Sequence, residues 1–229
     1  MVFIYKYGLI LNYRAYWLTS LEIKPDDPRR RSILSAGFPS GDQMFPIVLD
    51  PGALKLVLVG DGDAALKRLA LIDAAGLMHV EVYSASPGSD LKERAGSRLK
   101  GERPTSEALE AAHLVLIAGL GNDEAEALAG AARKAGRLVN TEDVKALCDF
   151  HIPSAVRRGD LLLTVSTGGK SPGLARRLRR HIETLFGPEW AGRLDELADR
   201  REGWRRQGMD IPSIGRHTDA YVDEKGWLS

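Results

Sequence analysis

The stretch "LKLVLVGDGDAALKRLALIDAAG", residues 54 to 76, decides the fold class of the chain. Residues 54–60 form an apolar run, which is typical of a strand buried on both faces of a parallel sheet. A helical pattern follows over residues 63–75, and Gly76 is a good residue to end it. The stretch therefore predicts a strand, a glycine turn and a helix in direct succession.

The same alternation continues along the chain. Further strands are predicted at 79–84, 113–119 and 137–140, and further helices at 106–112 and 122–136. Strands that alternate with helices favour a parallel sheet with right-handed crossovers. The pattern changes after Phe150. A strand is predicted at 160–167, and then a helix with one apolar face made of Leu174, Leu178, Ile182, Leu185 and Phe186. The tail from residue 188 is predicted to be helical in its first half at most.

Composition and charge exclude several classes of protein. The chain has 229 residues, of which 44% are hydrophobic and 28% charged, as in ordinary globular proteins. The net charge of +1 argues against a general nucleic-acid binder. The lone cysteine, Cys148, fits a reducing compartment, and its simplest interpretation is a small buried apolar side chain. No apolar run reaches the roughly 18 residues of a membrane span, so we expect a cytoplasmic protein without membrane contact.

Residues 1–43 differ from the rest of the chain in composition and lack a clear periodicity. Regular patterning begins abruptly at Met44. One hypothesis is that the natural start is Met44 and that residues 1–43 are an upstream extension. The alternative is a genuine but poorly ordered tail.

The turn after the first predicted strand fits the pattern Gly-x-Gly-x-x-Ala of dinucleotide-binding proteins. Gly60 permits the tight turn, Gly62 lets a pyrophosphate approach the backbone, and Ala65 allows close packing of helix on sheet. The acidic residue that usually ends the second strand and binds the ribose is missing, so the choice between NAD and NADP stays open. A parallel-sheet turn that merely needs glycines is the alternative.

A second glycine-containing segment, "VSTGGKSPGLARRLRRHI" at 165–182, resembles a phosphate-binding loop only superficially. The P-loop pattern requires a glycine five residues before the Gly169-Lys170 pair, and that position is Thr164. Ser171 is a good N-cap, and the helix start beside several arginines still favours an anion. The alternative for arginines 176, 177, 179 and 180 is a solvated helix surface.

Four pieces in order carry a resemblance to a known family. They are "FPIVLD" at 45–50, the Gly60 turn, "VNTEDVKALCDFHIPSAVRRGDL" at 139–161 and "VSTGGKSPGLARRLR" at 165–179. Together they resemble the precorrin-2 dehydrogenase/sirohydrochlorin ferrochelatase family, which includes the N-terminal part of siroheme synthase. The resemblance covers about residues 45 to 187.

The resemblance implies an enzyme that uses NAD to oxidise precorrin-2 to sirohydrochlorin, with subsequent insertion of ferrous iron in many members. It also implies a homodimer. The expected organisation is an α/β protein with a Rossmann-like domain at 44–152, a dimerisation and substrate segment at 153–187 and a small helical region at 188–229. The polyanionic substrate, with its acetate and propionate chains, identifies the anion that the arginine-bearing helix favours.

Candidate site residues follow from the matching positions. Asp143, three residues after Asn140, matches the family's functional aspartate and could accept a proton or polarise a metal; its alternative role is to cap a short helix from Val144. The candidate cofactor contacts are Gly60, Gly62, Asp63, Ala64, Ala85 and Ser86. The candidate substrate contacts are Thr167, Gly168, Gly169, Lys170, Ser171 and Arg176.

Two positions depart from the family pattern. Residues 118–121 read Ala-Gly-Leu-Gly where the family has Ala-Thr-Asp, and Asp61 interrupts the glycine turn, where its charge would oppose a pyrophosphate.

Histidines 113 and 151 are isolated, so no permanent metal site is expected and ferrous iron would be a substrate. A regulatory NAD-binding module and a dehydrogenase without chelatase activity are the rival functions.

Overall fold

The computed structural model describes residues 44 to 228 and divides the chain into two units, of which the second is Val48–Ser229. All the described helices and strands lie in this second unit. The extension expected at residues 1–43 lies outside the described residues.

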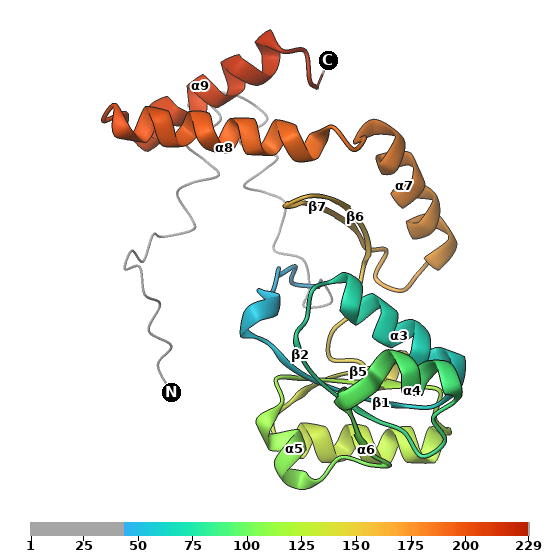
Figure 1. The fold of residues 1–229 in the computed structure, drawn as a ribbon. Helices are drawn as coiled ribbons and strands as arrows, with labels where there is room; N and C mark the ends of the chain where they lie inside the picture. The colour runs from blue at the N-terminus through green and yellow to red at the C-terminus, as the bar shows by residue number, and fades with distance from the viewer. Residues whose placement is uncertain (1–43, 229) are drawn as a thin grey trace, which may run out of the picture. The chain divides into compact units, whose positions relative to one another are not determined.

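A five-stranded parallel sheet forms the first half of this unit (Figure 1). Its strand order is β3-β2-β1-β4-β5. The strands are β1 (Lys55–Gly60), β2 (His79–Tyr83), β3 (Leu99–Gly101), β4 (Leu114–Ala118) and β5 (Leu138–Thr141). The helices between them are α3 (Gly62–Ala74), α4 (Ser89–Ala95), α5 (Ser106–Ala111) and α6 (Asn122–Lys134). This order confirms the Rossmann-like α/β fold, while the short elements α4 and β3 escaped prediction from the sequence.

Two apolar clusters hold the sheet between its helices. Alternate residues of β1 point to opposite faces, so Leu56 and Leu58 pack with Leu69 and Ile72 of α3. Val57 and Val59 join the cluster that contains Leu109 of α5 and the alanines of α6. Figure 1 shows α3 on one face of the sheet and α6 on the other. Because β1 is covered on both faces, its sequence reads as a continuous apolar run.

The order of the strands also fixes where a ligand can bind. The chain passes from β1 outward to β2 and β3, and then returns to the other side of β1 to form β4 and β5. In open parallel sheets the crevice at this change of direction, outside the carboxyl ends of the strands, is the usual ligand site. The relevant segments are therefore the turns that follow β1, β2, β4 and β5.

An antiparallel ribbon follows the sheet. It consists of β6 (Ser154–Arg158) and β7 (Leu161–Val165), joined at Gly159, whose φ of +58° suits the tight turn. Helix α7 (Pro172–Leu185) contacts both strands, and its Ala175 is buried. The predicted apolar face of α7 is only partly covered, because Leu174 and Leu185 are 48% and 59% exposed.

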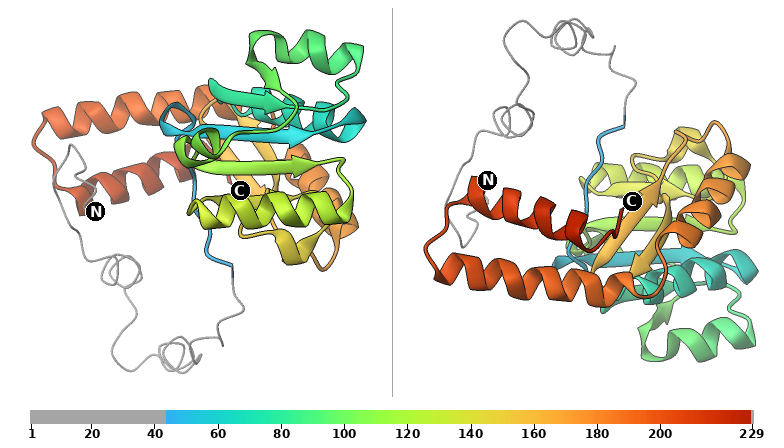
Figure 2. Two further views of the ribbon diagram at one scale, coloured as in Figure 1. Left: turned by 90° about the horizontal axis from the view of Figure 1, so that it is seen from below. Right: turned by 90° about the horizontal axis from the view of Figure 1, so that it is seen from above.

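Two longer helices complete the described chain, α8 (Trp190–Arg206) and α9 (Ile211–Glu224), and Figure 2 shows them side by side in both views. The expectation of helix only in the first half of the tail is wrong, since α9 lies in the second half. Its N-cap, Asp210, accepts a hydrogen bond from the Ser213 amide at 2.9 Å. Trp190 packs against Phe186 and Trp227 between these elements. Of the helices between residues 44 and 228, none is long and apolar enough to cross a bilayer.

Candidate functional site

The turn between β1 and α3 has the backbone geometry that a dinucleotide requires. A Cβ atom on Gly60 would stand 2.0 Å from the Ala118 carbonyl oxygen, so only glycine lets β1 and β4 approach this closely. Gly62 has a φ of +62° and open space where a Cβ would be. Helix α3 receives no side-chain cap from its N-cap residue, Asp61. Its first amides therefore fit the pyrophosphate of a dinucleotide such as NAD.

The carboxylate of Asp61 is directed to the end of β2. Its Oδ1 accepts hydrogen bonds from the Ser86 amide, at 2.8 Å, and from the Ser84 hydroxyl. Ser84 is buried, whereas Ala85 and Ser86 are exposed beside it. Asp61, the residue that departs from the glycine pattern, thus links the turn after β1 to the segment after β2.

Asp143 lies in the loop after β5 with an unusual backbone conformation. Its φ is +59°, and no other non-glycine residue between 44 and 228 has a positive φ. Asp and Asn tolerate this region better than most residues. The 3-10 helix that follows, η3 (Lys145–Leu147), has Val144 as its N-cap and no side-chain cap. The capping role considered for Asp143 is therefore wrong.

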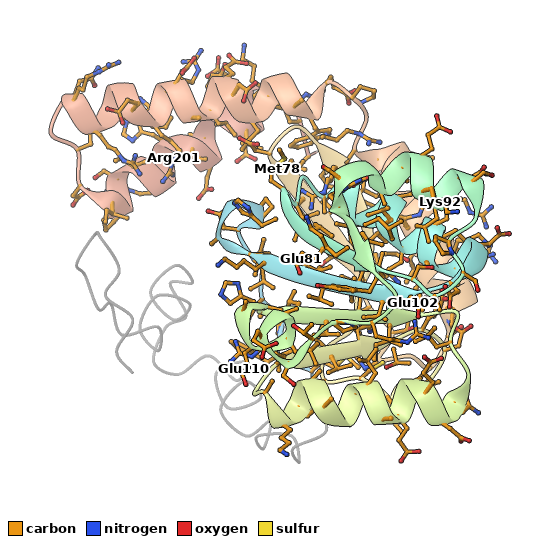
Figure 3. The ribbon with its side chains drawn as sticks, turned by 60° about the horizontal axis from the view of Figure 1, so that its bottom comes forward. Met78, Glu81, Lys92, Glu102, Glu110 and Arg201 are labelled. Atoms are coloured by element: carbon orange, nitrogen blue, oxygen red, sulfur yellow. The ribbon has the colours of Figure 1, made fainter. Side chains whose placement is uncertain are left out.

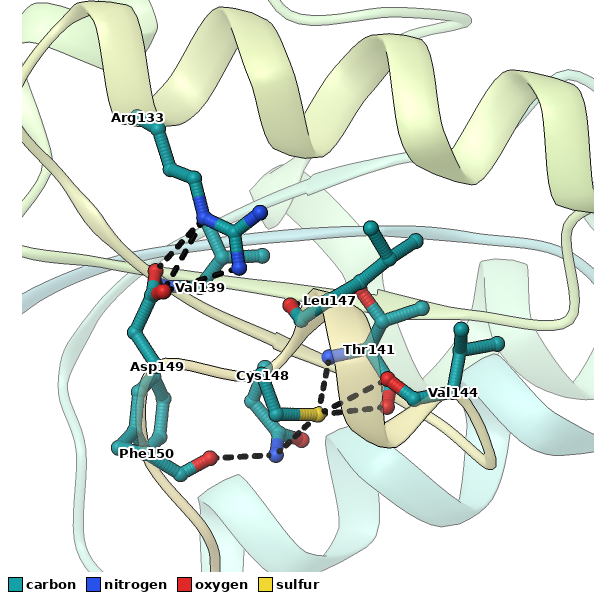
Figure 4. Close-up of polar contacts among 9 residues, drawn as sticks. Arg133, Val139, Thr141, Val144, Leu147, Cys148, Asp149 and Phe150 are labelled. Carbon is teal, nitrogen blue, oxygen red and sulfur yellow. Dashed lines mark hydrogen bonds and ion pairs between the residues drawn. The ribbon is translucent and has the colours of Figure 1, made fainter.

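Where the loop that carries Asp143 ends, it is tied back to β5 (Figure 4). The Asp149 carboxylate accepts from the Val139 amide at 2.9 Å, and the Asn140 side chain donates to the Phe150 carbonyl at 2.9 Å. Between them, Cys148 Sγ accepts from the Thr141 amide, and its single thiol hydrogen can be donated to the carbonyl oxygen of Thr141 or of Val144. Cys148 is only partly buried, so its interpretation as a merely apolar side chain is wrong.

The segment before α7 is a closed turn. The Thr167 hydroxyl bonds to both the amide and the carbonyl of Ser171, at 3.2 and 3.1 Å, and the Lys170 amide donates to the Thr167 carbonyl. Ser171 caps α7 by accepting from the Leu174 amide, as predicted. Lys145 donates to the Gly168 carbonyl at 3.4 Å, which connects this turn to the Asp143 loop.

Two neighbouring cavities lie between these segments. The smaller, of about 320 Å³, is lined by Arg68, Asn140, Glu142, Asp143, Lys145 and other residues of the loop. The larger, of about 480 Å³, is lined by Thr167, Arg176, Arg179 and parts of β6 and β7. His151, Ile152 and Gly169 line both. A carboxylate after β5 and the guanidinium groups of α7 therefore line two cavities that share three residues.

The structure brings some of the predicted site residues together and separates others. Asp143, Thr167, Gly169 and Arg176 line the two cavities. Gly168, Lys170 and Ser171 belong to the same turn but line neither of them. The candidate cofactor contacts, Gly60, Gly62, Asp63, Ala64, Ala85 and Ser86, lie outside both cavities, in the turns after β1 and β2.

Sequence reasoning missed several residues of the cavities. His151 lines both, although it looked isolated in the sequence. Arg179 was one of four similar arginines, and its proximity to Glu183 is an i,i+4 pair that the spacing could have indicated. Arg68 and Glu142 approach within 3.8 Å from distant positions in the chain, for which the sequence gives no signal. Among residues 44–228, no three His, Cys, Asp or Glu side chains lie close enough to hold a metal ion.

Comparisons with known proteins agree with this geometry. Residues 47–154 match a family model described as NAD(P)-binding, and residues 158–185 match the model of the sirohaem biosynthesis protein central region. The chain is 38% identical over 178 residues to the siroheme synthase of Methylococcus capsulatus, covering 76% of this chain and 37% of that protein. It is 35% identical over 164 residues to the siroheme synthase of Nitrosococcus oceani, covering 69% and 34%.

The chain thus spans about a third of the length of the curated relatives it matches. A solved structure described as SirC, precorrin-2 dehydrogenase, superposes with a TM-score of 0.62 at 22% identity, over 81% of this chain and 93% of that one, which shows a shared fold. The two adjacent family models, together with these identities, establish the relationship: the chain belongs to the precorrin-2 dehydrogenase/sirohydrochlorin ferrochelatase family that includes the N-terminal part of siroheme synthase.

Proposed function

We propose that the protein oxidises precorrin-2 to sirohydrochlorin with NAD, as a step of siroheme biosynthesis in the cytoplasm. One observation carries the proposal. The cavity that Asp143 lines shares His151, Ile152 and Gly169 with the cavity that Arg176 and Arg179 line, so a carboxylate and a cationic helix border neighbouring spaces. The membership of the family and the dinucleotide turn after β1 support it.

The cationic side of the larger cavity suits the carboxylates of a tetrapyrrole. Guanidinium groups bind carboxylates through two parallel hydrogen bonds, which gives both energy and orientation. Arg176 is exposed and lines the larger cavity, whereas Arg177 and Arg180 are exposed without lining either cavity. Arg179 is partly neutralised by Glu183, so Arg176 is the stronger candidate for a substrate contact.

The residues of the chain would position the ring and take up a proton. NAD supplies the hydride acceptor when it is bound. The oxidation removes a hydride and a proton from the macrocycle, and in this proposal Asp143, which lines the smaller cavity, accepts that proton as a general base. The loop that carries Asp143 is tied to β5 through Asp149 and Asn140, so its carboxylate is held on a fixed backbone.

A homodimer is part of the proposal. Leu174, Leu178 and Leu185 of α7 are between 40% and 59% exposed in the single chain. Exposed leucines that share one face of a helix are typical of a surface covered by a partner. A second copy of the chain is the partner that the family relationship favours.

Insertion of ferrous iron is a second candidate activity. Glu142, Asp143 and His151 line the same cavity, and they could contact an iron ion that is being delivered to a bound macrocycle. Iron would then be a substrate, held transiently by the chain.

The experiment that tests the proposal is anaerobic. Purified protein is mixed with precorrin-2 and NAD, NADH is followed by absorbance, and ferrous iron is added after that phase ends. NADH formation supports the dehydrogenase, and a siroheme spectrum that develops faster than in a control without enzyme supports the chelatase. Measurable NAD binding without NADH would instead favour a regulatory module.

A matched pair of variants tests the site. Arg176→Gln should raise the KM for precorrin-2 by about tenfold, because one charge-assisted hydrogen bond is worth roughly 1.5–3 kcal/mol. Arg177→Gln removes the same charge from the next residue of the helix and should leave the KM unchanged. An equal effect of both substitutions would show that only the overall charge of α7 matters.

A further inference from the structure

The segment after β2 lacks the residue that usually recognises the ribose of a dinucleotide. In Rossmann-type folds a carboxylate at the end of the second strand accepts hydrogen bonds from the ribose hydroxyls, and its charge disfavours the 2′-phosphate of NADP. Here β2 ends at Tyr83, and Ser84, Ala85 and Ser86 follow. None of these residues is acidic.

The acidic residue within β2 is engaged elsewhere. Glu81, labelled in Figure 3, accepts a hydrogen bond from the Tyr83 hydroxyl at 2.8 Å. Burial of Tyr83, reinforced by this hydrogen bond and the charge of Glu81, raises the pKa of the phenol to about 12. The Tyr83 proton therefore stays in place at neutral pH, and Glu81 remains its partner.

A different carboxylate reaches the end of β2, and it comes from the first turn of the fold. Asp61 Oδ1 accepts from the Ser86 amide and the Ser84 hydroxyl, as described above. Both hydrogen bonds use the same oxygen, so Oδ2 keeps its capacity to accept from a ligand. Asp61 thus brings a negative charge to the segment where the carboxylate of the second strand normally stands.

The backbone of Asp61 is held firmly. Its amide donates to the Ala118 carbonyl at 3.2 Å, and its own carbonyl oxygen lies so close to Gly119 that a Cβ there would stand 2.3 Å away. The backbone of Asp61 is thus anchored by β4, and its carboxylate by the segment after β2. A charge fixed in this way has a defined position, as recognition of a ribose requires.

We propose that Asp61 replaces the missing carboxylate of β2: it accepts a hydrogen bond from a ribose hydroxyl of NAD and discriminates against NADP by repelling its 2′-phosphate. This inference rests on the proposed function, because it assumes that the chain binds a dinucleotide at the β1–α3 turn. The inference goes beyond the proposed function because it assigns the choice between NAD and NADP to Asp61, a residue that departs from the glycine pattern.

The test measures binding of the two cofactors to the full-length protein without precorrin-2. Dissociation constants for NAD and NADP are determined by isothermal titration calorimetry for the wild type, Asp61→Asn and Asp61→Gly. Asn keeps an oxygen that can accept from Ser84 and Ser86 but carries no charge, and Gly restores an uncharged turn. Asp90→Asn, at the exposed start of α4, removes the same charge from a neighbouring element and is the matched control.

We expect the wild type to bind NAD more tightly than NADP. In Asp61→Asn and Asp61→Gly the ratio of the two dissociation constants should shift towards NADP by about tenfold or more, since one like-charge contact is removed. Added salt screens charges, so it should bring the dissociation constants for NAD and NADP closer together in the wild type. The same addition of salt should have a smaller effect in the two Asp61 variants. Asp90→Asn should behave as the wild type.

Two results would overturn the inference. If the ratio stays within about twofold in both Asp61 variants while NAD still binds, Asp61 is only a structural link, although the proposed function survives. If the wild type binds neither cofactor, the proposed oxidation fails together with the inference. Circular dichroism of each variant shows whether the fold is retained.

Discussion

The substitution Asp143→Asn separates the chemistry of this residue from its structural role. The backbone φ of +59° is one that both Asp and Asn adopt with little strain, so the loop should keep its shape. The carboxylate is exposed and takes no part in the hydrogen bonds and ion pairs found between residues 44 and 228. The free energy of unfolding should therefore change by less than about 0.5 kcal/mol.

Activity should respond very differently from stability. Loss of a general base typically lowers kcat by about 10²- to 10⁴-fold, while the NAD dissociation constant should stay unchanged. Asp143→Ala provides the comparison, because alanine in the left-handed region should cost roughly 1 kcal/mol of stability in addition. Initial rates of anaerobic NADH formation and urea unfolding curves are measured for all three proteins. Wild-type turnover in Asp143→Asn would refute the assignment of Asp143 as the base.

Three further predictions concern packing, pH and assembly. Gly60→Ala should destabilise the fold by about 3 kcal/mol in urea unfolding, because its Cβ would collide with the Ala118 carbonyl. Gly62→Ala should cost only about 1 kcal/mol, because a Cβ there meets open space and only the φ of +62° is unfavourable. Equal costs for the two substitutions would contradict the close approach of β1 and β4. Burial opposes the ionisation of Asp73, but hydrogen bonds and charge from Arg98 and Arg94 outweigh it and lower the pKa of this carboxyl. The pKa of Asp73 in the folded state thus lies below the unfolded value of roughly 3.9. The contribution of ionised Asp73 to the free energy of unfolding is therefore complete at pH values above the unfolded pKa, and it disappears as the pH falls through the folded-state pKa. Asp73→Asn should accordingly lose stability at pH 7 and match the wild type in strong acid, and a difference independent of pH would exclude this explanation. Leu178→Glu should shift a dimer to monomer in light scattering, and an unchanged mass would exclude α7 as the contact surface.

The layered fold could be predicted because its signal is local and repeated. Residues 54–60 form a buried strand flanked by neighbours on both sides, and such a strand needs apolar residues at every position. Gly76 and Gly136, both with positive φ, follow the ends of α3 and α6 as predicted. Helix α9 was not predicted, because its clearest signal is the N-cap residue Asp210 and few apolar residues follow it.

The site was harder to predict because its contacts join distant segments. The sequence showed that Asp61 interrupts a glycine pattern, but its partners Ser84 and Ser86 are more than twenty positions away. Likewise the meeting of Arg68 with Glu142 depends on the order of the strands. Cys148 illustrates a third limit, since an isolated cysteine in a sequence does not reveal whether its sulfur will have hydrogen-bond partners.

The tethered loop after β5 has a consequence for motion. Hydrogen bonds fasten its entry at Val139 and Asn140 to its exit at Asp149 and Phe150, so the whole of residues 140–150 moves with the sheet. The ribbon of β6 begins only at Ser154. A rotation of the ribbon relative to the sheet would therefore be taken up by residues 151–153, a connection of three residues that begins with His151 and ends with a proline. Two of the residues that line both cavities, His151 and Ile152, thus also belong to the connection between the sheet and the ribbon.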